Sequence, residues 1–203
     1  MIAIIDYGVG NLFSLGSSLR SIGAETETTG DPGAIRAADK LILPGVGAFR
    51  DAAARLRERG LFELVREQAG AGKPLLGICL GMQMLFEKSY EYGEYEGLAL
   101  LRGAVEPMAG VVPAALKLPQ MGWNALHLTR PEHPLFRYIH EGEYVYFVHS
   151  YYAARCAETV IAVTDYGAPI TAAVAKDNVW GCQFPPEKSG PAGLALLRAF
   201  CEV

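Results

Sequence analysis

The sequence describes an acidic and rather apolar chain of a size that suits one compact domain. It has 203 residues, of which 51% are hydrophobic and 20% are charged, and its formal net charge is −4. A chain of this length can bury a sizeable core, so we expect a single domain over residues 1–203. The acidic balance argues against a partner such as nucleic acid or an anionic membrane surface. No apolar run reaches the ~18 residues that suggest a membrane span.

The four cysteines indicate a reducing compartment. Cys79, Cys156, Cys182 and Cys201 form no CxxC pair and show no metal-ligand spacing. We therefore expect free thiols and no metal site. The N-terminal segment is apolar but meets Asp6 at once and has no basic leader, which argues against a signal peptide. These features predict a cytoplasmic protein.

Short apolar runs alternate with helical patterns through the first half of the chain. Strands are predicted at residues 2–6, 40–47 (breaking at Pro44) and 73–78. Helices are predicted at residues 12–23, at 52–70 and from residue 80 onward, the first because its leucines share one helical face. Alternation of this kind is typical of a parallel sheet that is covered on both faces.

The second half is richer in strands. Residues 143–153, 159–167 and 170–184 are predicted as strands joined by tight turns, and residues 190–203 as a closing helix. The polar stretches 89–97 and 129–136 are predicted as loops within the domain. The expected fold is therefore α/β, with an open and mostly parallel sheet and helices on both faces.

The stretch Gly77-Ile78-Cys79-Leu80-Gly81 is the most informative part of the sequence. It has the form Gly-x-nucleophile-x-Gly at a strand-to-helix junction, where a tight turn exposes the central side chain. Such a turn places Cys79 at a helix N-terminus, which favours the thiolate. The backbone N–H of Leu80 would then face a developing oxyanion. The alternative is a small buried cysteine at the end of an apolar strand.

Two glycine-rich turns follow other predicted strands. Pro44-Gly45-Val46-Gly47 could turn backbone amides toward a bound carbonyl group, or it could be an ordinary turn. The stretch "DYGVGN" at residues 6–11 resembles part of a dinucleotide fingerprint, but Phe13 occupies the position of the third glycine. No P-loop exists either, so no nucleotide cofactor is expected.

Three motifs, "GICLGMQ", "PGVGAF" and "QFxPEKS", together resemble those of the class I glutamine amidotransferases, and the resemblance covers essentially the whole chain. Three more, "DYGVGN", "PQMGWN" (119–124) and "YFVHSYY" (146–152), are similar to those of the glutaminase subunits of imidazole glycerol phosphate synthases. The resemblance implies hydrolysis of L-glutamine to glutamate and ammonia through a cysteine thioester. It also implies a heterodimer with a cyclase subunit, a (β/α)₈ barrel that uses the ammonia to convert PRFAR to imidazole glycerol phosphate and AICAR phosphate in histidine biosynthesis.

The resemblance assigns roles to individual residues. Cys79 would be the nucleophile and Glu187 the carboxylate that orients a catalytic histidine. The remaining assignments are Val46, Gly47 and Leu80 to the oxyanion, Gln83, His149, Ser150 and Tyr151 to substrate glutamine, and Asn11, Trp123 and Lys188 to the partner. Simpler alternatives stay open: a solvated Gln83, a locally bonded Ser150, a packed strand residue at His149, and a core position for Trp123.

The chain departs from the family at the position of the catalytic histidine. The family reads Gln-Phe-His-Pro-Glu-Lys-Ser, whereas this chain has Pro185 at the third position. Proline has no imidazole and no backbone N–H, so it cannot move a proton. An extended strand end accommodates proline, so we expect the fold to survive and the glutaminase activity to be impaired or lost.

Other readings remain. Among His127, His133, His140 and His149, only His149 lies on a segment expected near the substrate, so it is the one possible substitute base. A non-catalytic subunit that docks on the cyclase would also fit, as would a sibling glutaminase. An α/β cysteine hydrolase of another kind would not explain "PQMGWN".

Overall fold

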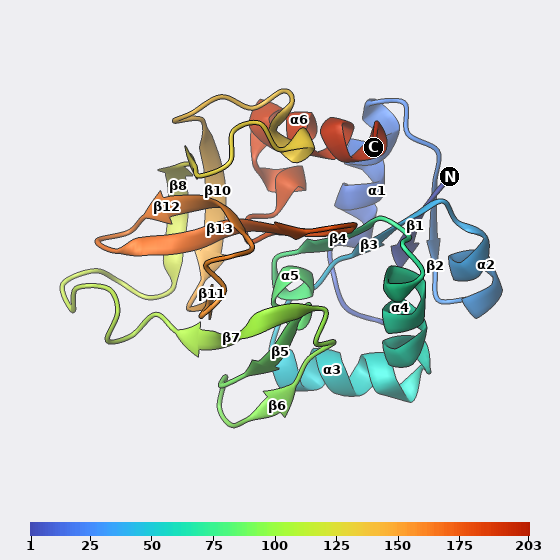
Figure 1. Cartoon of the computed structure of the whole chain (residues 1–203), viewed down its shortest axis with the longest axis horizontal. Coiled ribbons are helices and arrows are strands. Elements are labelled where there is room, and N and C mark those ends of the chain that lie inside the picture. The colour runs from blue at the N-terminus through green and yellow to red at the C-terminus, as the bar shows by residue number, and fades with distance from the viewer.

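The computed structural model describes residues 1–203 and is built on an eight-stranded sheet with helices on both faces (Figure 1). The strands follow in the spatial order β2 (Thr26–Thr29), β1 (Ile2–Ile5), β3 (Lys40–Leu43), β4 (Leu75–Ile78), β14 (Val179–Cys182), β13 (Pro169–Lys176), β12 (Val160–Asp165) and β9 (His127–Leu128). The first five run parallel, and the last three join antiparallel. The predicted open, mostly parallel sheet is confirmed.

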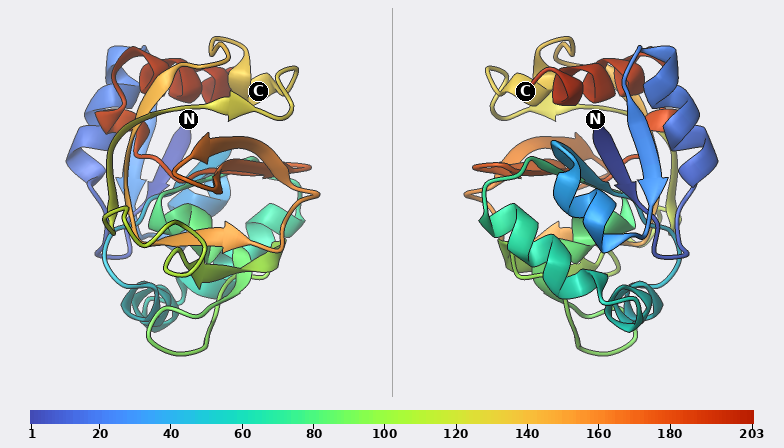
Figure 2. Two further views of the ribbon diagram at one scale, coloured as in Figure 1. Left: turned by 90° about the vertical axis from the view of Figure 1, so that its left-hand side faces the viewer. Right: turned by 90° about the vertical axis from the view of Figure 1, so that its right-hand side faces the viewer.

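Alternating residues of the parallel strands point into two separate cores. Ala3 and Ile5 of β1 belong to the core beneath α2 (Pro32–Ala37), α3 (Phe49–Glu58), α4 (Leu61–Gly70) and α5 (Leu80–Met84). Ile2 and Ile4 point to the opposite core, under α1 (Leu12–Ser21) and α6 (Gly190–Cys201). The two edge-on views show these layers on either side of the sheet (Figure 2). Burial of both faces explains why β1, β3, β4 and β14 are apolar without alternation.

The predicted helix over residues 52–70 is in fact two helices. Gly60 separates α3 from α4 with a φ of +68°, a left-handed conformation that glycine adopts without strain. The chain turns there, so that α3 and α4 pack against each other. The helix predicted from residue 80 is also shorter than expected, because the chain enters the strand β5 (Phe86–Ser89) immediately after α5.

The second half forms two further sheets. The predicted strand 143–153 breaks at Ser150 into β10 (Tyr144–His149), which pairs with β8 (Gln120–Ala125), and β11 (Tyr151–Ala154), which pairs with β7 (Leu101–Pro107). The second of these sheets continues through β5 to β6 (Tyr95–Glu96). The predicted loops 89–97 and 129–136 contain β6 and the 3₁₀ turn η1 (Pro134–Phe136). None of the helices is both long and apolar enough to cross a bilayer.

Candidate active site

The ends of the parallel strands bring the predicted motifs to one edge of the large sheet. Leu43 of β3 is level with Gly77 of β4, and Ile78 of β4 is level with Cys182 of β14. The segments that follow these strands therefore emerge side by side, and the Cys79 backbone N–H donates to the Cys182 carbonyl oxygen over 2.8 Å. Open α/β sheets hold their ligands at this carboxyl edge.

Cys79 stands in a strained turn that requires the glycines on both sides of it. Its φ of 55° and ψ of −114° form a conformation that side chains rarely adopt. A Cβ on Gly77 would lie 2.7 Å from the Gly81 carbonyl oxygen, and a Cβ on Gly81 would lie 1.8 Å from the Leu43 carbonyl oxygen. Because no side chain fits at these distances, the Gly-x-Cys-x-Gly pattern is a steric requirement of the turn, as the sequence predicts.

Burial keeps the Cys79 thiol protonated. The loss of water around the sulfur raises its pKa to about 11 and outweighs the Leu80 backbone N–H, which lowers it. The start of α5 does favour the thiolate, as the sequence predicts, because the Leu80 N–H lowers the pKa, but desolvation is the larger effect. The helix α5 has only five residues, so its end does not compensate for the desolvation of the sulfur. A thiol in this state needs a base before it can attack a substrate.

Cys79 lines a cavity of about 270 Å³. The residues that the resemblance assigns to the oxyanion and to glutamine all line this cavity as well: Val46, Gly47, Leu80, Gln83, His149, Ser150 and Tyr151. Glu91, which lies in the predicted loop 89–97 and has no role that the sequence predicts, lines it too. Its carboxylate accepts the backbone N–H of Phe49 over 2.5 Å at the start of α3, a contact that no local sequence pattern predicts.

Two buried glutamines link the Cys79 turn to the neighbouring strands. The Gln83 side-chain amide donates to Gln183 Oε1 over 3.0 Å and to the Tyr151 carbonyl oxygen over 3.1 Å. Gln183 donates to Cys79 Sγ at 3.8 Å. The protein thus uses both N–H groups of Gln83, and the solvated alternative for that residue is wrong, since it is only 6% exposed. Gln183 was missed as a site residue, although a polar residue directly after a buried strand was a usable signal.

His149 is a neutral side chain that faces the same cavity. Its Nδ1 lies 2.8 Å from the Tyr151 carbonyl oxygen and therefore carries the hydrogen that bonds to it. Its Nε2 is buried and has no hydrogen-bond partner. Burial lowers the pKa of His149 to about 4. An imidazole with such a pKa is a poor proton acceptor near neutral pH.

Glu187 shares a cavity with Pro185, and no histidine lines this cavity. It belongs to the 3₁₀ turn η2 (Pro186–Lys188), and its Oε2 is buried without a hydrogen-bond partner. Burial raises the pKa of this carboxyl group, although the Lys188 charge and the Asn11 side chain act in the opposite direction. Cys79, Pro185 and Glu187 line one small cavity of about 60 Å³. Nothing that titrates near neutral pH stands between the thiol and the carboxylate.

Pro185 does not disturb the backbone around it. Its φ of −74° and ψ of 112° are ordinary extended values. Its carbonyl oxygen accepts the Ser189 hydroxyl over 2.8 Å, and Ser189 Oγ accepts the Tyr146 backbone N–H over 3.1 Å. These bonds tie η2 to β10, so the turn keeps its shape despite the proline.

The residues assigned to the partner divide into two groups. Asn11 and Lys188 line the small cavity beside Glu187. Trp123 lies on the surface, 53% exposed, with its ring against that of Tyr146, so its alternative as a core residue is wrong. Phe13, also on the surface, is 81% exposed. Phe13 lies on α1 and Trp123 lies on the strand that pairs with β10, and both α1 and β10 pack against η2.

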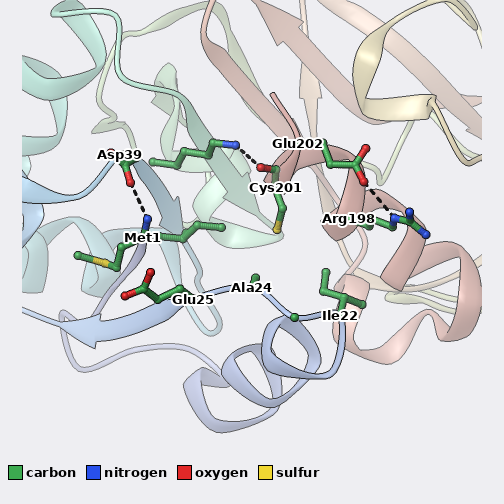
Figure 3. A pocket seen from close by; sticks show the side chains of 11 residues that line it. Met1, Ile22, Ala24, Glu25, Asp39, Arg198, Cys201 and Glu202 are labelled. Atoms are coloured by element: carbon green, nitrogen blue, oxygen red, sulfur yellow. Dashed lines mark hydrogen bonds and ion pairs between the residues drawn. The ribbon is translucent and has the colours of Figure 1, made fainter.

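A larger cavity lies elsewhere and offers no comparable chemistry. It has a volume of about 700 Å³ and is lined by the first residues of β1 and β3 and by the end of α6 (Figure 3). Four of its charged groups form ion pairs, Met1 with Asp39 and Arg198 with Glu202. No group of three or more His, Cys, Asp or Glu side chains in the chain could hold a metal ion.

Comparisons with known proteins agree with this geometry. The family described as Glutamine amidotransferase class-I matches residues 3–203. The "Imidazole glycerol phosphate synthase subunit HisH" of Sulfurimonas denitrificans is 50% identical over 202 residues, which cover 98% of this chain and 97% of that protein. The protein of the same name from Wolinella succinogenes is 46% identical over the full length of both chains.

Solved structures share the fold at much lower identity. A "Crystal structure of glutamine amidotransferase" superposes with a TM-score of 0.76 at 22% identity, covering 99% of this chain and 97% of that one. The "Structure of PurLQS from Thermotoga maritima" gives a TM-score of 0.72 at 17% identity, covering 99% and 97%. The chain belongs to the class I glutamine amidotransferases, and within them to the family of the imidazole glycerol phosphate synthase subunit HisH.

Proposed function

We propose that this chain is the glutamine amidotransferase subunit of an imidazole glycerol phosphate synthase, and that Pro185 disables its glutaminase step. In the full reaction Cys79 attacks the side-chain amide of L-glutamine, ammonia leaves, and water hydrolyses the glutamyl thioester. A cyclase subunit then uses the ammonia to convert PRFAR to imidazole glycerol phosphate and AICAR phosphate. The four free thiols suit a cytoplasmic setting.

The observation that carries this proposal is that the site keeps the predicted residues around Cys79 but has no base for the thiol. Cys79 keeps its strained turn, and the residues assigned to the oxyanion and to substrate glutamine share its cavity. Glu187 keeps a buried oxygen without a partner, which is the oxygen that an imidazole N–H would satisfy. The thiol, with a pKa of about 11, has no base to ionise it.

This geometry supports a role for each of the remaining residues. The Leu80 N–H already interacts with the Cys79 sulfur, and together with an amide of the Val46–Gly47 turn it would stabilise the tetrahedral oxyanion. Gln83 Oε1, Ser150 and Tyr151 are the polar groups that would hold the amino-acid end of glutamine. Trp123 would anchor the cyclase, because an exposed aromatic ring next to the site is a common interface hot spot.

The second candidate is a subunit that never hydrolyses glutamine and only steadies the cyclase. Pro185 favours it, whereas the intact Cys79 turn does not. A sibling glutaminase is less well supported, because the named relatives at 46–50% identity are HisH proteins and the other glutaminases match only at the level of fold.

Product formation by the assembled complex tests the proposal. The chain is mixed with a HisF-type cyclase and PRFAR, and imidazole glycerol phosphate is measured with either ammonium or glutamine as the nitrogen source. We expect turnover with ammonium, little or none with glutamine, and recovery with glutamine in Pro185→His. A chain that forms no complex with the cyclase, or a Pro185→His variant that folds but gains nothing, would refute it.

A further inference from the structure

The small cavity beside Cys79 has the size of a single ring. Its volume is about 60 Å³, whereas one water molecule needs about 10–15 Å³ on the same measure. Leu15, Ile78 and Val148 contribute apolar walls, and the side chain of Pro185 occupies only part of the space that an imidazole side chain at that position would fill.

Two polar residues line this cavity, and one needs a hydrogen-bond donor whereas the other needs a proton acceptor. Glu187 Oε2 is a buried acceptor that lacks a donor. Cys79 carries a protonated thiol with no proton acceptor, since in its contact with Gln183 the sulfur accepts a hydrogen bond and donates none. A planar ligand that donates one N–H and offers one bare nitrogen would satisfy both groups at once.

We infer that this cavity binds imidazole and planar nitrogen heterocycles of similar size that carry one N–H and one bare ring nitrogen, and that bound imidazole supplies the base that Pro185 removed. The inference rests on the proposed function for its catalytic part, because the bound ring must act on the Cys79 thiol during glutamine hydrolysis. The binding part depends only on the cavity and on Glu187.

The proton and the bonds balance in each half of the reaction. The bare nitrogen takes the Sγ proton while sulfur forms a bond to the amide carbon of glutamine, and Glu187 accepts the N–H of the resulting imidazolium. The imidazolium gives a proton to the leaving nitrogen, the C–N bond breaks and ammonia departs. Water then adds to the thioester with the ring as base, the C–S bond breaks, and glutamate and the free thiol remain.

The test measures glutamate release by the complex with the cyclase at increasing concentrations of imidazole and, separately, of 1-methylimidazole. The two compounds have similar basicity, but the methylated ring has no N–H for Glu187. We expect imidazole to raise the rate at least tenfold with saturation, and 1-methylimidazole to have little effect. Pro185→His, which carries its own ring, should not respond, and Glu187→Gln should lose most of the stimulation.

Different results would overturn different claims. A linear rise that is equal for both compounds would indicate catalysis by free buffer and would refute the site. No stimulation by imidazole, with Pro185→His active, would refute the inference and leave the proposed function intact. If Pro185→His is inactive, the proposed function fails, but the binding of imidazole can still be tested by ligand-detected NMR. We expect a binding signal for imidazole with this chain and none with Pro185→His. Equal signals with both proteins would show that imidazole does not bind in this cavity.

Discussion

Pro185→His places an imidazole in the cavity between Cys79 and Glu187, and we expect it to restore the hydrolysis of glutamine. The backbone at this position is extended in an ordinary way, so histidine enters without strain. The Ser189 bonds that hold the turn use the carbonyl oxygen of residue 185 and not its side chain. The new ring would meet the buried, unpartnered oxygen of Glu187.

The size of the gain follows from the state of the thiol. With a pKa of about 11, roughly one Cys79 in 3,000 is ionised at about pH 7.5. A histidine that takes the proton during the attack removes most of this factor. Protonation of the leaving ammonia by the same ring adds about 100-fold or more. We therefore expect kcat to rise by roughly 10⁵-fold, within the range over which triad residues act in other enzymes.

Glutamate formation, coupled to glutamate dehydrogenase in the presence of the cyclase and its ligand, measures this gain. Pro185→Ala is the matched control, because it also removes the proline ring but adds no base, and it should stay as slow as the unchanged chain. Equal rates for Pro185→His and Pro185→Ala, with equal melting temperatures, would refute the reasoning. A fast reaction of the unchanged chain would place the base elsewhere, and His149→Ala would then be the next variant to assay.

Three further predictions concern the thiol, the turn and the surface. Because burial raises the pKa of Cys79 to about 11, the rate of alkylation by iodoacetamide should rise about tenfold per pH unit until the pH reaches this pKa. Cys79→Ala gives the background rate, and a rate that levels off near pH 7 would contradict the prediction. Gly81→Ala should lower the free energy of unfolding by more than about 3 kcal/mol or prevent folding, since its Cβ would overlap the Leu43 carbonyl oxygen. Gly70→Ala meets nothing within 4 Å and should be neutral or stabilising by up to ~1 kcal/mol. Thermal unfolding of both variants measures the difference. Trp123→Ala should weaken binding to the cyclase by about 30-fold with no change in Tm. Val203→Ala, at a position that is also exposed, should leave the affinity unchanged. Calorimetric titration measures both affinities, and a larger loss for Val203→Ala than for Trp123→Ala would contradict the prediction.

Some of the site could be predicted because short-range sterics dictate it. The Gly-x-Cys-x-Gly stretch predicts a tight turn, and the structure shows both glycines in contacts that no Cβ would permit. The strands at residues 2–5, 40–43 and 75–78 are apolar runs with clear punctuation, so their burial and their parallel pairing followed from hydrophobicity alone. The lack of a proton carrier at residue 185 is likewise a property of the proline itself.

Other features depend on residues that are distant in sequence. The end of α5 and the start of β5 at Phe86 are set by pairing with β7, and the break at Ser150 arises because β10 and β11 join different sheets. Helical periodicity and apolar alternation describe single segments and carry no information on which strand will pair with them. Here the pairing of strands distant in sequence, and not local secondary-structure propensity, sets where these elements end.

The sequence by itself determined the family motifs, the tight turn at Cys79 and the proline at residue 185, because each is carried by the identity of residues that are close together in the chain. Only the tertiary structure decided that Cys79 is a protonated thiol, that Gln183 contacts it, that Trp123 is exposed and that a ring-sized cavity separates Cys79 from Glu187. Desolvation, exposure and empty volume are set by the atoms that surround a group, and here those atoms come from strands and turns that lie far apart in the sequence.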